Sequence, residues 1–282
     1  MATKTLSQNI TQAISDFGTI KQAIINKGVQ VPSGTPTSQY GAKIGEIQSG
    51  GSSSDDLKGM IERTATEIAL PSDCTKIGDY AFYQYSKLTS VDIPESVTSI
   101  GYTAFRECYN LALTSLPESL TSIGSYAFNS CKNLALTSLP SGLTTIGGSA
   151  FQACTSLALT SLPSGITSIA SQTFYDCTSL ALTSLPEGIN SIGYGVFNGC
   201  KNLALTSLPE GITSIESSAF ERCTGLTEIT FEGTPTSLKS SVFNGCTNLT
   251  TIRVPWSEGE VANSPWGATN ATIVYNYTPE TT

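Results

Sequence analysis

The sequence has 282 residues, of which 39% are hydrophobic and 13% are charged, with 14 Lys and Arg against 22 Asp and Glu. The formal net charge of −8 argues against nucleic acid as a partner, because affinity for a phosphate backbone comes largely from Lys and Arg. The chain has no histidine, which removes the commonest general base, the imidazole-dependent Ser and Cys triads and every zinc site that needs His ligands.

The amino terminus has no feature of a targeting segment. Residues 1–9 contain one Lys and no apolar run, unlike a secretory signal peptide. The chain also has no stretch of ~18 apolar residues that would span a bilayer. We therefore expect synthesis in the cytoplasm and no membrane insertion, with a virion-associated or extracellular final location left open.

Residues 1–48 are predicted to be a helical segment. Apolar residues at steps of three and four predict an amphipathic helix over residues 6–27, and a second helix is expected around residues 40–47. Residues 49–56 are rich in Gly and Ser and predict a flexible linker. The segment from residue 20 to residue 40 resembles short helical modules of tail-associated structural proteins of bacteriophages and prophages. These helices would anchor the protein or join copies of it into a homo-oligomer.

A repeat of 23 residues then runs through residues 57–255. Four residue columns keep this period without a slip. The phenylalanines are Phe82, Phe105, Phe128, Phe151, Phe174, Phe197, Phe220 and Phe243. An Ile or Leu column starts at Ile77, a Leu column starts at Leu88, and prolines recur from Pro71 to Pro209. One unit is too small to bury its own apolar residues, so neighbouring units must stack around a continuous core.

Each unit is predicted to contribute one strand that ends just before its proline. Val91 and Ile93 alternate with polar residues, as a half-buried strand requires, and Pro94 ends the strand because it lacks an N–H group. Nine such strands are expected to form one parallel sheet. The glycine column that includes Gly101 and Gly124 is expected to supply a turn with positive φ. The following Tyr-x-Ala-Phe-x-x-Cys segment has room for about one helical turn.

The repeat resembles the BspA-like class of bacterial leucine-rich repeats. Residues 96–108, SVTSIGYTAFREC, follow the consensus of that class, and eight units share the pattern in register. The resemblance implies an α/β repeat solenoid, a right-handed and curved leucine-rich-repeat parallel β-solenoid of about nine strands. It also implies a role in adhesion or protein binding and no catalytic residues.

Two columns of chemically active side chains need a structural explanation. Seven cysteines, one per unit, form a column three residues after the phenylalanine: Cys108, Cys131, Cys154, Cys177, Cys200, Cys223 and Cys246. We expect small, buried, reduced thiols, because a ladder with one Cys per coil does not bring metal ligands together from different directions. Cys74 lies in an aliphatic column and is expected to pack in the same way. Glu95, Glu118, Glu187 and Glu210 follow the prolines and are expected to form a solvated edge or a weak cation site rather than a glycosidase pair.

The five middle units differ from the others inside the predicted strand. They read Leu-Ala-Leu-Thr-Ser-Leu, as at residues 111–116, where the outer units have a pattern such as LTSVDI at residues 88–93. Either the third position is an exposed leucine stripe and the Thr points inward, or a local bulge turns these leucines into the core. We expect the bulge, because five exposed leucines would promote aggregation. The candidate binding residues on this strand face are Leu113, Ser115, Leu136, Ser138, Leu159, Ser161, Leu182, Ser184, Leu205 and Ser207.

Residues 256–282 depart from the repeat and are predicted to form a cap and tail. A last coil without a cap exposes apolar core and a free strand edge, so Trp256 and Trp266 are expected to cover it. Residues 254–275 also resemble the carboxyl ends of some phage-tail proteins. The sequence predicts a protein without enzymatic activity, metal or cofactor, which recognises a protein or glycan partner through the solenoid surface. A structural part of a phage-tail-like particle and a secreted host-directed adhesin are the alternatives.

Overall fold

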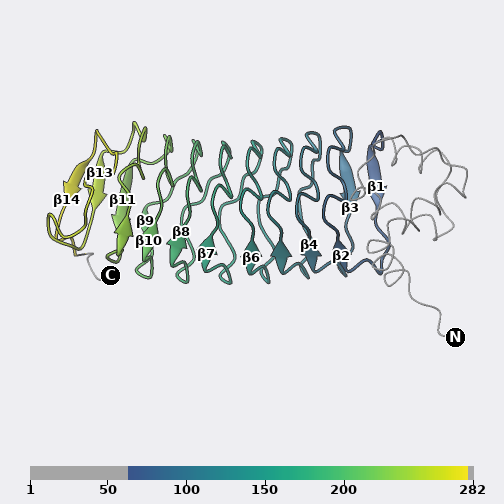
Figure 1. Ribbon diagram of the computed structural model, residues 1–282, viewed down its shortest axis with the longest axis horizontal. Helices are drawn as coiled ribbons and strands as arrows, with labels where there is room; N and C mark the ends of the chain where they lie inside the picture. The colour runs from purple at the N-terminus through teal and green to yellow at the C-terminus, as the bar shows by residue number, and fades with distance from the viewer. Residues whose placement is uncertain (1–62, 279–282) are drawn as a thin grey trace, which may run out of the picture.

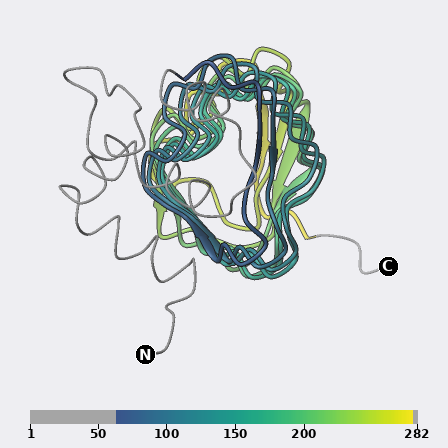
Figure 2. The same ribbon diagram turned by 90° about the vertical axis from the view of Figure 1, so that its right-hand side faces the viewer.

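The chain forms a parallel β-solenoid in the computed structural model, which describes residues 63–278. Figure 1 shows the coils side by side along the long axis, and Figure 2 looks down that axis at the ring formed by each coil. Paired positions such as Ile77 with Ile100 and Ile229 with Ile252 are 23 residues apart, which confirms the predicted parallel solenoid and its period. The predicted helices of residues 1–48 and the linker of residues 49–56 lie outside the described residues.

The first ladder of strands lies just before the proline column, as predicted. It contains β1 (Glu67–Ala69), β3 (Ser90–Asp92), β9 (Ser207–Leu208), β11 (Glu228–Phe231), β13 (Thr251–Arg253) and β14 (Thr272–Val274). The pairs are parallel and run β1–β3 and β9–β11–β13–β14. Four coils between β3 and β9 have no strand at this position, so the prediction of one sheet with a strand in every unit was wrong.

A second ladder, which the sequence did not predict, lies where the chain approaches the glycine column. It contains β2 (Lys76–Ile77), β4 (Ser99–Ile100), β5 (Ser122–Ile123), β6 (Thr145–Ile146), β7 (Ser168–Ile169), β8 (Ser191–Ile192), β10 (Ser214–Ile215) and β12 (Ser237–Leu238). These strands pair in two parallel runs, β2–β4–β5–β6 and β7–β8–β10–β12. A strand of two residues is too short to show alternation, which is why the sequence pattern does not reveal it.

The turn segments around the phenylalanines contain no helix in the part of the chain that the structure describes. The predicted helical turn was therefore wrong, and the hydrogen bonds give the reason. The Phe105 amide donates to the Ala127 carbonyl of the next coil at 2.7 Å, whereas the Cys108 amide donates back to the Phe105 carbonyl at 3.1 Å. Local bonds thus alternate with bonds between coils. Residues with positive φ, such as Tyr126 (58°) and Ser130 (63°), also interrupt any helical run.

The glycine column serves close packing rather than the positive φ that we expected. Gly101, Gly124, Gly147 and Gly193 are absent from the described residues with positive φ. A Cβ atom on Gly124 would lie 2.7 Å from the Gly101 carbonyl carbon of the preceding coil, and one on Gly193 would lie 2.7 Å from the Ser171 amide nitrogen. The absence of a side chain therefore lets two backbones approach each other at this corner.

The core is one continuous stack of side-chain columns. The phenylalanines from Phe82 to Phe243 are fully buried, and neighbouring rings stack with centroids 5.0–5.8 Å apart. Each ring between Phe82 and Phe243 contacts the ring of the coil on either side, so the interior has no boundary between these coils.

Trp256 and Trp266 cover the last coil of the stack. Trp256 and Trp266 are 2% and 0% exposed, and the Trp256 ring lies 5.2 Å from the Phe231 ring between centroids. The Trp266 indole N–H donates to the Ala262 carbonyl at 2.8 Å, which satisfies its polar edge. β14 pairs with β13 and adds a final strand to the first ladder.

Candidate functional site

The middle coils turn the leucine at the third position of the Leu-Ala-Leu-Thr-Ser-Leu segment into the core. Leu136, Leu159 and Leu182 are 0% exposed, Leu205 is 2% exposed, and Leu113 is partly buried against the core. This confirms the inward arrangement of these leucines. In each middle coil two adjacent residues, a Thr and a Ser, lie between two inward leucines. An inward step of three residues cannot alternate as a strand does, so the regular ladder is lost there.

The backbone of these coils makes few bonds to its neighbours. The Ala135 amide donates to the Leu113 carbonyl at 3.0 Å, and the same bond recurs from Ala158 to Leu136. Among the described residues, the amides of Thr137, Ser138 and their counterparts in the adjacent coils have no partner, apart from a long bond of 3.5 Å made by Thr183. These coils therefore leave backbone donors available to solvent.

The paired Thr and Ser residues form the surface that we call the Thr–Ser wall. It consists of Thr114, Ser115, Thr137, Ser138, Thr160, Ser161, Thr183, Ser184, Thr206 and Ser207, of which all but the half-buried Ser207 are exposed. Within residues 63–278 their hydroxyl groups make no hydrogen bond. By contrast, the hydroxyls of Thr98 and Thr121 near the second ladder donate to carbonyls of the preceding coil at 3.2 and 3.1 Å.

The candidate residues from the sequence therefore separate into two groups. The serines lie on the outer surface, where a partner can reach them, whereas the leucines of the same strand face contribute to the core. Residues 133–175, which span the centre of the wall, contain no Lys, Arg, Asp or Glu. The wall is thus a polar surface without charge over its middle coils.

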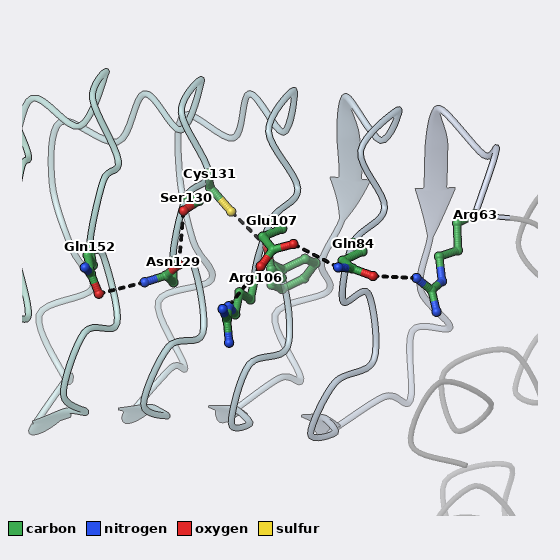
Figure 3. A network of polar contacts seen from close by, with 9 residues as sticks. Arg63, Gln84, Arg106, Glu107, Asn129, Ser130, Cys131 and Gln152 are labelled. Atoms are coloured by element: carbon green, nitrogen blue, oxygen red, sulfur yellow. Dashed lines mark hydrogen bonds and ion pairs between the residues drawn. The ribbon is translucent and has the colours of Figure 1, made fainter. Parts of the chain in front are cut away.

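The turn side of the first coils is also polar, but its side chains bond to one another. Figure 3 shows Arg63, Gln84 and Glu107 in one chain of hydrogen bonds and Asn129 with Gln152 in another. The lengths of these bonds are all 2.9 Å. Because these bonds join side chains of successive coils, the network stabilises the contact between neighbouring coils. A partner would have to break the bonds before it could use the same groups.

The cysteine column is buried, as predicted, and its thiols are free in the structure. The thiol of Cys131 donates to the Phe105 carbonyl at 3.0 Å, and the other six members of the column bond in the same way. Burial raises the pKa of Cys108 and of Cys246 to about 12. A thiol that stays protonated is a poor nucleophile and metal ligand. Among residues 63–278, no group of three or more His, Cys, Asp or Glu side chains is placed to hold a metal ion.

Two of the four carboxylates after the prolines bind backbone, whereas Glu187 and Glu210 are exposed at the edge. Glu95 accepts a hydrogen bond from the Glu118 amide at 3.0 Å, and Glu118 accepts one from the Ser141 amide at 3.4 Å. They are exposed and joined to successive coils, which is unlike a pair of catalytic carboxylates facing each other across a cleft.

A pocket that the sequence did not predict lies at the carboxyl-terminal end of the Thr–Ser wall. It has a volume of about 660 Å³ and is lined by Thr206, Ser207, Glu228, Thr230, Glu232, Arg253 and Tyr277. Arg253 donates to the Glu228 carboxylate at 2.8 Å, and its guanidinium carbon lies 5.7 Å from the centroid of the Tyr277 ring. The hydrogen bond to Glu228 raises the pKa of Arg253 above its ordinary value.

The geometry of stacked 23-residue coils with leucine, isoleucine and phenylalanine columns defines a leucine-rich-repeat β-solenoid. The chain belongs to the family described as the BspA type leucine rich repeat region, which it matches over residues 62–181 and 149–266. The family is generally non-catalytic. No curated protein matches this chain.

Solved structures of bacterial leucine-rich-repeat proteins are similar to this chain. A protein from Bacteroides ovatus is 26% identical with a TM-score of 0.51, and the alignment covers 75% of this chain and 61% of the other. The T. pallidum leucine rich repeat protein is 30% identical with a TM-score of 0.48, and the alignment covers 66% of this chain and 78% of the other. A leucine rich cell surface protein from Faecalibacterium prausnitzii is 25% identical with a TM-score of 0.47, and the alignment covers 77% of this chain and 64% of the other. This chain thus spans about three fifths of the B. ovatus protein.

The comparisons with known proteins give no support to the resemblance to phage-tail proteins, which stays a prediction. The part of the chain that the structure describes contains no helix with the length and apolarity needed to cross a membrane.

Proposed function

We propose that this chain is a non-catalytic recognition protein that binds a protein or glycan partner through the Thr–Ser wall. The observation that carries the proposal is the unused hydrogen-bonding capacity of that wall. Its exposed hydroxyl groups and many of its backbone amides have no partner among the described residues, whereas the hydroxyls of Thr98, Thr121 and Thr144 beside the second ladder are paired.

The arrangement of the wall suits a surface that a partner covers. Free donors and acceptors recur once per coil, and the phenylalanine rings of successive coils lie 5.0–5.8 Å apart between centroids. A partner that aligns with several coils gains one set of hydrogen bonds from each. Such bonds are individually weak in water, so affinity requires many of them.

The proposal is tested by adding charge to the centre of the wall. Ser138→Lys combined with Ser161→Lys adds two positive charges where residues 133–175 have none. Wild-type protein should bind at least one member of arrays of purified glycans and host extracellular proteins. The affinity of the double variant should be at least about tenfold lower, because two ammonium groups must be desolvated on contact.

A matched control adds the same charge to the same coils, directly before the second-ladder strands β6 and β7. Thr144→Lys with Thr167→Lys also changes two exposed hydroxyl residues in adjacent coils. This control should keep wild-type binding, and both variants should keep the wild-type melting temperature. Unchanged binding by the wall variant would place the site elsewhere, and an absence of wild-type binding to every array member would contradict the proposed function.

A further inference from the structure

We infer that the pocket at the carboxyl-terminal end of the Thr–Ser wall is a saccharide subsite that binds a neutral sugar through two adjacent hydroxyl groups. We define this site, the terminal pocket, by Thr206, Ser207, Glu228, Thr230, Glu232, Arg253 and Tyr277. The inference rests on the proposed recognition function and names the chemistry of one part of the surface.

The terminal pocket is assembled from three consecutive coils and the tail. β11 places Glu228 and Thr230 on its outer side, since Ile229 and Phe231 between and after them are buried. Register pairing sets Thr230 beside Ser207 of β9 on one side and beside Arg253 of β13 on the other. Residues from adjacent strands therefore form a continuous floor, and Tyr277 adds an aromatic ring from beyond β14.

The Glu228–Arg253 pair presents an acceptor next to a donor. One N–H group of Arg253 donates to the Glu228 carboxylate at 2.8 Å, and the other donors of its guanidinium group have no partner in the described chain. Guanidinium has five donors and an ionised carboxylate has only acceptor positions. A hydroxyl group can donate and accept. Two neighbouring hydroxyls on a sugar ring can therefore donate to Glu228 while they accept from Arg253, without breaking the pair.

The remaining lining groups fit the same ligand. The hydroxyls of Thr206, Ser207 and Thr230 and the carboxylate of Glu232 make no hydrogen bond within residues 63–278. Tyr277 offers an apolar ring to the C–H face of a sugar. The pocket volume of about 660 Å³ lies within the ordinary range for ligand sites, ~300–1,000 Å³.

The charges of the pocket favour a neutral ligand. The lining contains two carboxylates and one guanidinium. An anionic sugar would face both carboxylates, and the whole chain carries a formal charge of −8. A Lys side chain from a cationic peptide would approach Glu228 against the charge of Arg253 and would leave the free Arg253 donors without an acceptor.

Affinity electrophoresis of the full chain tests the inference. Native gels would contain dextran, yeast mannan, galactomannan or a mixed-linkage β-glucan, with polygalacturonate gels and added polylysine as the charged probes. The wild-type protein should be retarded by at least one neutral polysaccharide and by neither charged probe. Periodate cleavage of vicinal diols, followed by borohydride reduction, should abolish the retardation by that polysaccharide.

Substitutions in the pocket and matched controls locate the site. Arg253→Gln and Tyr277→Ala should each weaken binding by about tenfold or more, since each removes a direct ligand contact. Arg222→Gln and Tyr194→Ala should leave binding within about twofold, because these exposed side chains lie outside the pocket. Melting temperatures of all four variants would verify that each is folded.

Each outcome bears on the inference. Loss of retardation confined to the pocket variants supports it. Retardation that survives in Arg253→Gln and Tyr277→Ala overturns it, and if Ser138→Lys with Ser161→Lys then abolishes binding, the proposed function stands without this subsite. Retardation by no neutral polysaccharide, or by polylysine or polygalacturonate alone, also overturns it.

Discussion

Single atoms control how closely the coils can stack. At the glycine corner the coils can approach closely because glycine has no Cβ, and the backbone of the preceding coil occupies the place where a Cβ would lie. In the turn segments the cysteines act instead through their sulfur atoms, which bond to a carbonyl that lies in the preceding coil. Both columns thus determine the contact between coils rather than the conformation of one coil.

Gly124→Ala should destabilise the solenoid by about 1–3 kcal/mol, because its Cβ must push two backbones apart. Such a Cβ would lie 2.7 Å from the Gly101 carbonyl carbon. Gly142→Ala is the matched control, since its Cβ would come no closer than 3.9 Å to Glu118. It should leave the free energy of unfolding within about 0.5 kcal/mol of wild type. Denaturant titration measures both values, and equal destabilisation would contradict the packing explanation.

The buried thiols should make stability fall at alkaline pH. Burial raises the pKa of Cys108 and Cys246 to about 12, from an ordinary value near 9. Above pH 9 the unfolded chain loses these protons while the folded chain keeps them, so the unfolded state is favoured. Each such thiol should cost about 1.4 kcal/mol per pH unit above 9, and nothing below it.

Urea titrations at pH 7, 8, 9 and 10 measure this dependence. Burial also raises the pKa of Cys154 and of Cys177. A Cys154→Ala and Cys177→Ala double variant should therefore lose less stability between pH 9 and 10 than wild type, although it is less stable at pH 7. Equal losses would show that other groups cause the alkaline effect.

At the scale of elements, the sequence predicted the columns better than the strands. The unbroken phenylalanine and proline columns were enough to predict a parallel solenoid and the period of its coils. The two-residue strands, such as Ser122–Ile123, were missed because no alternation can appear in two residues. The turn segment was taken for a helix because its length fits one, whereas its amides bond partly to the next coil.

The candidate site was predicted only in part for a related reason. The serines of the Thr–Ser wall could be found because all five middle units repeat them. The terminal pocket combines single, non-repeated residues such as Glu228 and Arg253 with Tyr277, which lies outside the repeat. Residues that come together once, from different coils, have no period by which to recognise them.

The inward leucines of the middle coils predict a large loss of stability at one residue and almost none at the next. Leu159 is 0% exposed, so Leu159→Ala should cost about 2–5 kcal/mol. Thr160 is exposed and its hydroxyl has no partner among the described residues, so Thr160→Ala should change stability by about 0.5 kcal/mol or less. Thermal and urea unfolding compare the two variants. The reverse order would mean that the Thr points inward and the leucine outward.

At the scale of the whole molecule, a solenoid depends on what closes its ends. Stability in a stack is approximately a sum of unit and interface contributions, so an internal change weakens the two interfaces next to it. The last coil has only one neighbouring coil. Trp256 and Trp266 cover its open side, with ring centroids 6.0 Å apart, and β14 pairs with the outer side of β13.

Removal of the chain from Pro255 onward should therefore cause association more than loss of fold. The truncation bares Phe231, which packs against both tryptophans, and Phe243, which packs against Phe231. It also frees the edge of β13 for pairing with another chain. Light scattering coupled to size exclusion should detect oligomers or aggregates, while circular dichroism should keep the strand signal of the remaining coils. A chain that ends at Thr278 is the control, since it retains both tryptophans and β14, and it should elute as the full-length protein does. A truncated protein with the same oligomeric state as this control at all concentrations would indicate that the tryptophan cap does not protect the end of the solenoid.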